Sequence, residues 1–115
     1  MLFDMTYPDT QIIIMAAGKG TRMECDDLPK VMVPVLGKPM LEHMMTTIES
    51  LHLKRKPLLV VGYKREHVTD FFKDRADYAI QEEQLGTAHA VMAALPKLAD
   101  NPPKQVVILN GDHPF

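Results

Sequence analysis

The chain has 115 residues, of which 46% are hydrophobic and 24% are charged, a size and composition typical of one globular domain. Its formal net charge of −2 provides no general basic field, which argues against duplex DNA or RNA as a partner. The single cysteine, Cys25, excludes a disulfide framework within the chain and favours an intracellular, cytoplasmic location.

Apolar strands alternate with amphipathic helices along the chain. Strands are predicted at 11–16, 58–63, 78–81 and 106–109, with a short extended segment at 31–35 that turns at Gly37. Helices are predicted at 39–53, with Pro39 at the first position, at 66–73 and at 87–98. The first apolar run is too short to span a membrane, and no basic segment of a signal peptide precedes it. The alternation predicts an α/β fold with a mostly parallel, Rossmann-like sheet.

The predicted helices carry apolar side chains at helical spacing, which indicates that one face of each is packed in a core. In the helix at 66–73, Val68, Phe71 and Phe72 are expected to face inward. In the first helix the methionine-rich face is expected to fill the core rather than to bind a ligand. That face comprises Met40, Leu41, Met44, Met45, Ile48 and Leu51.

The loop after the first strand reads "AAGKGTRMECDDLPK" from 16 to 30. It fits neither the P-loop pattern nor the dinucleotide-binding glycine pattern. Its small residues nevertheless allow backbone N–H groups to approach a ligand closely, and its basic residues suit phosphate. This loop directly follows the first strand, and α/β proteins bind ligands at the carboxyl ends of their strands. A glycine-rich turn with solvated basic residues is an equally open reading. The residues concerned are Ala16, Ala17, Gly18, Lys19, Gly20, Arg22 and Lys30.

A second candidate segment, "QEEQLGTAHA" at 81–90, opens the third helix. The amide of Gln81 or Gln84 can both donate and accept, so it could read the edge of a base such as a pyrimidine. Gly86 permits close approach of the backbone, and Thr87 is expected to cap the helix. Taken alone, the segment is better explained as an ordinary capped helix start. His89 is expected to be a packed or partly exposed helical residue and not a ligand.

The fourth strand ends in "NGDHPF", which places Asp112 beside a glycine at a strand tip. A single carboxylate at this position suits Mg²⁺, which typically takes one or two carboxylates together with substrate phosphates and water. An ordinary turn aspartate is the alternative.

Taken together, "AAGKGTRM", "LPK", "PVLGKPML", "VVGY", "QEEQLGTAHAV" and "NGD", in this order, resemble the sugar nucleotidyltransferase family. Within it, the chain is most similar to the uridylyltransferase (pyrophosphorylase) domains of the N-acetylglucosamine-1-phosphate uridylyltransferase type. The resemblance implies the nucleotide-diphospho-sugar transferase fold. Domains of this family continue beyond 115 residues, so residues 1–115 are expected to be the amino-terminal, nucleotide-binding part of a truncated domain.

The resemblance also implies roles for individual residues. Arg22 and Lys30 match the catalytic basic residues that contact the triphosphate and the transferred phosphoryl group. Asp112 matches the aspartate that binds the catalytic Mg²⁺. The glycine-rich loop matches the loop that lies against the nucleotide in this family. Its residues are Ala16, Ala17, Gly18, Lys19 and Gly20. Gln81 and Gln84 match the positions that recognise uracil, and Gly86 and Thr87 match the continuation of that base pocket.

The function implied is transfer of a uridylyl group from UTP to a sugar 1-phosphate, with N-acetylglucosamine 1-phosphate as the expected sugar, and release of pyrophosphate. Two alternatives stay open: a truncated or inactive fragment that only binds nucleotide, and a related thymidylyl or cytidylyl transferase. The expected partners are UTP and a sugar 1-phosphate, with no nucleic acid and no membrane. The sequence leaves an oligomer open.

Overall fold

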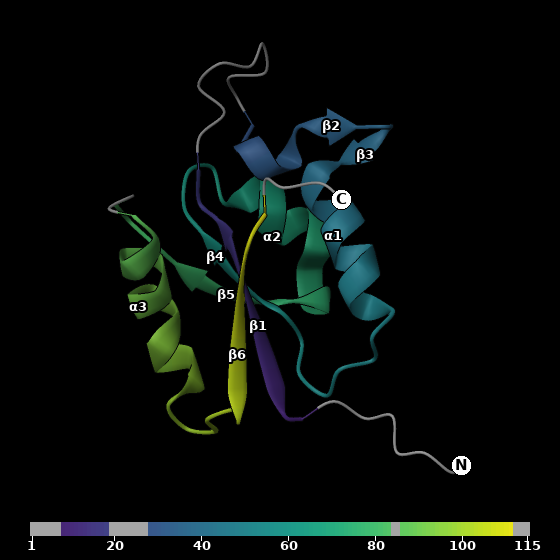
Figure 1. Ribbon diagram of the computed structural model, residues 1–115. Helices are drawn as coiled ribbons and strands as arrows, with labels where there is room; N and C mark the ends of the chain where they lie inside the picture. The colour runs from purple at the N-terminus through teal and green to yellow at the C-terminus, as the bar shows by residue number, and fades with distance from the viewer. Residues whose placement is uncertain (1–7, 19–27, 84–85, 112–115) are drawn as a thin grey trace, which may run out of the picture.

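A computed structural model describes residues 8–18, 28–83 and 86–111 (Figure 1). Its centre is a four-stranded sheet in the order β5–β4–β1–β6, in which every neighbouring pair is parallel. The prediction of a mostly parallel α/β sheet is therefore confirmed. The strands are β1 (Thr10–Ala16), β4 (Leu58–Val61), β5 (Asp77–Ile80) and β6 (Gln105–Asn110).

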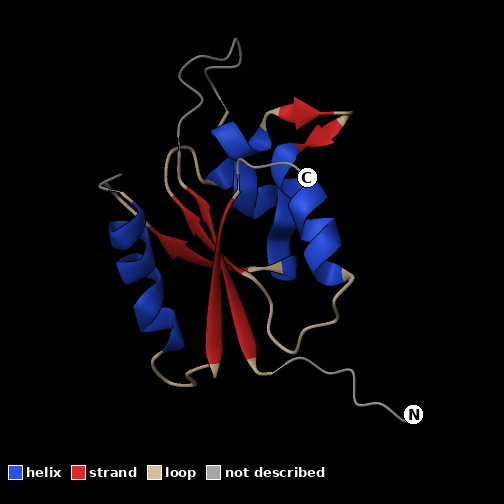
Figure 2. Ribbon diagram, viewed as in Figure 1, coloured by secondary structure: helices blue, strands red, loops and turns tan. Residues whose placement is uncertain are grey.

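Helices cover both faces of this sheet, as Figure 2 shows. On one face lie α1 (Met40–Glu49), α2 (Glu66–Phe72) and the short 3-10 helix η1 (Lys30–Met32). On the other face lies α3 (Thr87–Leu98). None of the helices in these described ranges is long and apolar enough to cross a membrane.

Alternation along β1 divides the core into two layers. Ile12 and Ile14 face α1 and α2, where they pack with Leu41, Met45 and other apolar residues. Ile13 faces α3 and packs with its small residues, such as Ala94. Because a strand buried on both faces needs apolar residues at successive positions, the continuous run in β1 is explained by its place between two helical layers.

A small hairpin replaces part of the extended segment predicted at 31–35. Its strands are β2 (Pro34–Val35) and β3 (Lys38–Pro39), which pair antiparallel. Leu36 and Gly37 join them with φ values of 52° and 82°, as a two-residue hairpin turn with positive φ at both positions requires. The prediction was wrong for Val31 and Met32, which lie in η1 and are buried.

Two apolar residues predicted to face inward are partly exposed. Leu51 lies beyond the end of α1 and is 38% exposed, so that helix is shorter than its apolar pattern. Phe71 is 42% exposed, whereas its neighbour Phe72 is fully buried with Val68. A seven-residue helix has few positions that face the core, and in α2 these are Val68 and Phe72, which are spaced four residues apart. Phe71 instead packs on Phe72, with ring centroids 4.8 Å apart.

A cluster of charged side chains joins α1 to the short 3-10 helix η2 (Lys73–Arg75). The guanidinium of Arg75 contacts the carboxylates of Glu42 at 2.7 Å and Glu49 at 2.9 Å. It also lies 5.3 Å from the ring centroid of Phe72. The hydrogen bond from Arg75 lowers the pKa of the Glu49 carboxyl below its ordinary value. The cluster therefore ties two elements of the same helical layer together.

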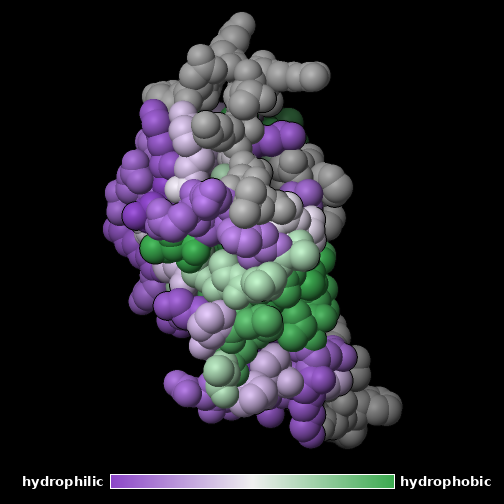
Figure 3. Space-filling model, turned by 90° about the vertical axis from the view of Figure 1, so that its left-hand side faces the viewer, coloured by the Kyte–Doolittle hydropathy of each residue, from purple (hydrophilic) through white to green (hydrophobic). Residues whose placement is uncertain are grey.

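Strand β6 is an edge strand of the four-stranded sheet within the described part of the chain. One of its edges pairs with β1, and its side chains Val106, Val107 and Ile108 are 39% to 43% exposed. Met92 and Leu95 of α3 are also exposed. Figure 3 shows an apolar area bordered by hydrophilic residues on the side of the molecule that α3 covers.

Candidate functional site

The strand order creates a natural crevice between β1 and β6. Connections that leave β1 and β4 run over one face of the sheet, whereas α3, which leads into β6, covers the other face. At such a switch point the loops after neighbouring strands diverge and leave room for a ligand at the carboxyl ends of the strands.

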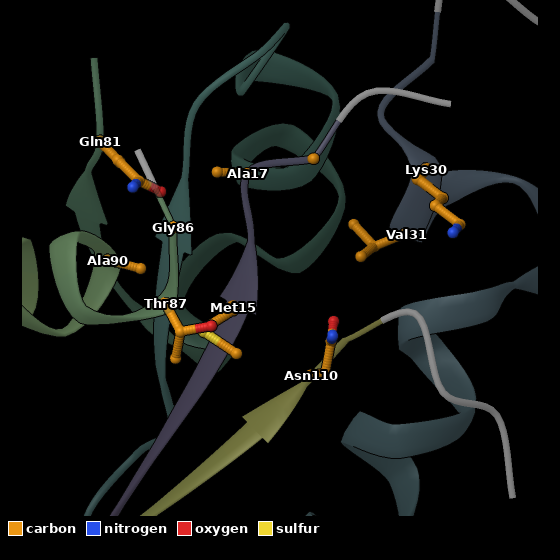
Figure 4. Close-up of a pocket in the computed structure, with 10 residues that line it drawn as sticks. Met15, Ala17, Lys30, Val31, Gln81, Gly86, Thr87, Ala90 and Asn110 are labelled. Carbon is orange, nitrogen blue, oxygen red and sulfur yellow. The ribbon is translucent and has the colours of Figure 1, made fainter. Parts of the chain in front are cut away.

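A pocket of about 200 Å³ opens at this edge (Figure 4). The residues that line it come from the exits of β1, β5 and β6, the start of α3 and the helix η1. They are Met15, Ala17, Gly18, Lys30, Val31, Gln81, Gly86, Thr87, Ala90 and Asn110.

The exit of β1 brings small residues and a lysine to the pocket. Ala17 and Gly18 line it directly, whereas Ala16 is 1% exposed and packs in the core. The backbone N–H of Lys30 donates to the carbonyl of Gly18 at 3.2 Å. This bond joins the two ends of the loop, so that Lys30 lines the pocket although it stands twelve positions after Gly18 in the chain.

Gly62, at the end of β4, allows two walls of the site to meet. A Cβ atom added at Gly62 would lie 2.9 Å from the carbonyl oxygen of Gln81 and 3.1 Å from the Cβ of Ala17. Beside it, the backbone N–H of Gln81 donates to the carbonyl of Val61 at 2.8 Å. The exits of β1 and β5 are therefore in contact through a position where a side chain would not fit.

Gln81 places a buried amide in the pocket. The residue is 4% exposed, and its side-chain nitrogen lies 2.9 Å from Nδ1 of His89 on α3. In Figure 4 the side-chain oxygen of Gln81 is on the side of Ala17. Figure 4 also shows Gln81 and Lys30 on opposite sides of Ala17. The pocket thus has an amide end and a cationic end, separated by small residues.

The start of α3 forms the wall next to Gln81. Gly86 takes the N-cap position with φ 106°, a conformation that favours glycine, and it provides no side-chain cap hydrogen bond. The prediction that Thr87 caps the helix is wrong, because Thr87 is already the first helical residue. It lines the pocket instead, with its hydroxyl oxygen turned toward Met15 in Figure 4.

The exit of β6 closes the remaining side. Asn110 lines the pocket, and the backbone N–H of Gly111 donates to the carbonyl of Met15 at 3.0 Å. A Cβ at Gly111 would approach Val31 Cγ1 to 3.0 Å and Ile14 Cγ2 to 3.1 Å. Sequence reasoning did not select Asn110, Met15 or Val31 for the site, although the position of Asn110 at a strand end was an available signal.

Six residues predicted for the site therefore line one pocket: Ala17, Gly18, Lys30, Gln81, Gly86 and Thr87. The predicted residues Lys19, Gly20, Arg22, Gln84 and Asp112 lie outside the described residues. Within the described ranges, no three histidine, cysteine, aspartate or glutamate side chains cluster to hold a metal ion. The Mg²⁺ site therefore stays a prediction.

Comparison with known proteins gives relatives along most of the chain. A protein named bifunctional protein GlmU from Desulfitobacterium hafniense is 42% identical over 108 residues, which is 94% of this chain and 23% of that protein. The protein of the same name from Acholeplasma laidlawii is 53% identical over 87 residues, 76% of this chain and 18% of the relative. This chain thus spans about a quarter or less of these relatives' length.

Solved structures agree with the fold. The crystal structure of HddC from Yersinia pseudotuberculosis complexed with GMP-PN matches with a TM-score of 0.73 and 30% identity, over 89% of this chain and 47% of that one. The fold and the pocket at its carboxyl edge define a Rossmann-like α/β class of domain with a ligand pocket at the ends of its parallel strands. Within it, the chain belongs to the family of MobA-like NTP transferase domains, whose model matches residues 12–115.

Proposed function

We propose that this chain is the nucleotide-binding part of an enzyme that transfers a uridylyl group from UTP to a sugar 1-phosphate. N-acetylglucosamine 1-phosphate is the proposed sugar because the motifs resemble those of N-acetylglucosamine-1-phosphate uridylyltransferases, and both relatives named above are GlmU proteins. The observation that carries the proposal is the buried amide of Gln81, which faces the pocket on the opposite side of Ala17 from Lys30.

The two ends of the pocket suit the two ends of a nucleoside triphosphate. An amide can pair with the donors and acceptors on the edge of a pyrimidine, so the base is assigned to the end at Gln81. A lysine ammonium is a compact positive charge that suits phosphate oxygens, so the triphosphate is assigned to the end at Lys30. Ala17 and Gly18, between them, have almost no side chain to keep the nucleotide from the backbone.

The reaction needs little covalent chemistry from the protein. An oxygen of the sugar phosphate would attack the α-phosphorus of UTP, and the bond from that phosphorus to the bridging oxygen of pyrophosphate would break. The attacking phosphate is already ionised near neutral pH, so no general base is required. Catalysis then consists of positioning and charge stabilisation, which is the work proposed for Arg22 and Lys30.

Mg²⁺ is part of the proposal, with Asp112 as its ligand. Strand β6 ends beside the pocket at Asn110, two positions before Asp112 in the chain. Mg²⁺ prefers oxygen ligands, carboxylates among them, and when bound it would add positive charge at the phosphates.

Calorimetry with Mg²⁺ and five nucleotides tests the proposal: UTP against TTP, CTP, ATP and GTP. Selective binding of UTP is expected, and thermal unfolding gives a second readout because a ligand of the folded state raises its stability. Preference for TTP or CTP would replace the uridylyl assignment by a related transferase. Absence of binding to all five would refute the assignment of the pocket. Pyrophosphate release with N-acetylglucosamine 1-phosphate, measured separately, tests turnover by the chain itself.

A further inference from the structure

The side chains of Gln81 and His89 form a pair across two elements of the site. Gln81 follows β5, and His89 lies in the first turns of α3, eight positions later. The distance from Gln81 Nε2 to His89 Nδ1 is 2.9 Å, which is that of a hydrogen bond. Gln81 is almost fully buried, whereas His89 is partly exposed. His89 does not itself line the pocket.

This pairing makes the two ends of the Gln81 amide unequal. An amide carries a donor end and an acceptor end, and a ring nitrogen without a proton accepts from the donor end. With its NH₂ group donating to His89 Nδ1, Gln81 presents its carbonyl oxygen to the pocket. Figure 4 shows that oxygen on the side of Ala17, which lines the pocket. The orientation of Gln81 therefore depends on a residue outside the pocket.

We propose that His89 is a positioning residue that sets the base preference of the site by holding the Gln81 amide with its oxygen toward the ligand. The inference rests on the proposed function, because it concerns the nucleotide assigned to this pocket. Uracil carries an N3–H donor between two carbonyl groups, whereas cytosine has an acceptor at N3. An amide oxygen held in place accepts from uracil N3–H and faces the N3 lone pair of cytosine unfavourably.

Without His89 the amide can rotate by half a turn and present its NH₂ group instead. The site would then accommodate cytosine as readily as uracil, because each base would find a matching end of the same side chain. A buried polar group that lacks its partner costs about tenfold or more in affinity. The preference for UTP over CTP is accordingly expected to fall about tenfold when His89 is removed.

Four variants separate positioning from a general structural role. The Oδ1 atom of asparagine stands at the same number of bonds from Cα as Nδ1 of histidine, so His89→Asn keeps an acceptor for Gln81. His89→Gln places its acceptor one bond further, and His89→Ala removes it. His67→Ala is the matched control, since His67 is a partly exposed histidine of α2 on the opposite face of the sheet.

The dissociation constants of UTP and CTP are measured by calorimetry with Mg²⁺ for the wild-type chain and each variant. We expect His89→Ala and His89→Gln to lose about tenfold in the UTP-to-CTP preference. His89→Asn and His67→Ala are expected to retain it. In the chain without nucleotide, the nuclear magnetic resonance signals of the Gln81 NH₂ group should shift in His89→Ala but not in His67→Ala. Thermal unfolding verifies that each variant is folded.

Two results would overturn the inference. Equal weakening of UTP and CTP in His89→Ala would mean that His89 only supports the fold. An unchanged preference, with unchanged Gln81 signals, would mean that the pair does not orient the amide. Either result leaves the proposed function intact as long as the wild-type chain binds UTP. Failure of the wild-type chain to bind any pyrimidine nucleotide would instead refute the proposed function, and the base preference assigned to His89 with it.

Discussion

Gly62→Ala is the substitution that most directly tests how the site is built. The new Cβ would stand 2.9 Å from the carbonyl oxygen of Gln81 and 3.1 Å from the Cβ of Ala17. The first contact is shorter than real side chains make, so at least one neighbour must move by a few tenths of an ångström. The oxygen belongs to the backbone after β5, and Ala17 belongs to the exit of β1. The shift therefore falls on two walls of the pocket.

Overpacking of this kind costs about 1–3 kcal/mol, or roughly 4–12 °C in the melting temperature of a domain of this size. We also expect the dissociation constant of UTP to rise about tenfold, which corresponds to ~1.4 kcal/mol, because Gln81 and Ala17 are displaced from their places in the pocket. Calorimetry measures the affinity, and thermal unfolding measures the stability.

Gly37→Ala is the control for the loss of a glycine. Gly37 has φ 82° and nothing within 4 Å of an added Cβ, so its substitution costs about 1–2 kcal/mol of backbone strain without a steric contact. It lies in the β2–β3 turn and does not line the pocket. Stability should fall in both variants, but UTP affinity only in Gly62→Ala. A Gly62→Ala variant that melts and binds like the wild-type chain would refute the contact between the two strand exits.

Three further predictions follow from the site and from the charged cluster. Arg22→Ala should weaken UTP binding by about 1.5–3 kcal/mol, the range for a charged hydrogen bond, and an unchanged dissociation constant by calorimetry would remove Arg22 from the site. Asp112→Asn should abolish the Mg²⁺ dependence of nucleotide binding, and persistence of that dependence would place the metal elsewhere. Arg75→Leu should lower the free energy of unfolding at pH 7 by about 1 kcal/mol, since both pairs are partly exposed and screened by solvent. Arg75 lowers the pKa of Glu49 in the folded protein. The stability that this ion pair contributes is therefore fully present above the ordinary pKa of the carboxyl and is lost as the pH falls through the lowered pKa of the folded state. Urea titrations should therefore show that the difference in free energy of unfolding between the wild type and Arg75→Leu becomes smaller below about pH 4.5. A difference that stays constant at all pH values would contradict the role of the ion pairs.

Periodicity was sufficient to predict the sheet and its helices. The run in β1 is apolar at successive positions because both of its faces are covered, and α3 begins at Thr87 and ends at Leu98 as predicted. One error arose because a short helix leaves two neighbouring apolar residues in competition for the same buried position. Phe71 and Phe72 both fit the inner face of α2, and only the packing around the helix decides that Phe72 is buried.

The candidate site was predictable where a residue follows a strand directly, as Ala17, Gly18 and Gln81 do. What the sequence could not provide was the contact between segments. Gly62 matters because the exits of β1 and β5 meet there, and His89 matters because its ring reaches Gln81 across the sheet edge. Neither contact leaves a periodic pattern. The contact at Gly62 depends on strand exits far apart in the chain, and the Gln81–His89 pair depends on how α3 packs beside the end of β5.

The central place of β1 has a consequence for the order in which the chain folds. Its two partners come late: β1 pairs with β4 through Ile13 and Leu58, and with β6 through residues 95 positions apart, such as Thr10 and Gln105. A chain emerging from the ribosome at about 5–20 residues per second exposes Ile12 to Ile14 for several seconds before β6 has been made. Contacts so distant in sequence also slow folding, because long loops must close before the pairing stabilises them. The apolar strand β1 is therefore synthesised before both of its partner strands and is enclosed on both edges only after β6 has been made. Transient exposure of apolar residues in a nascent chain is the situation in which chaperones act.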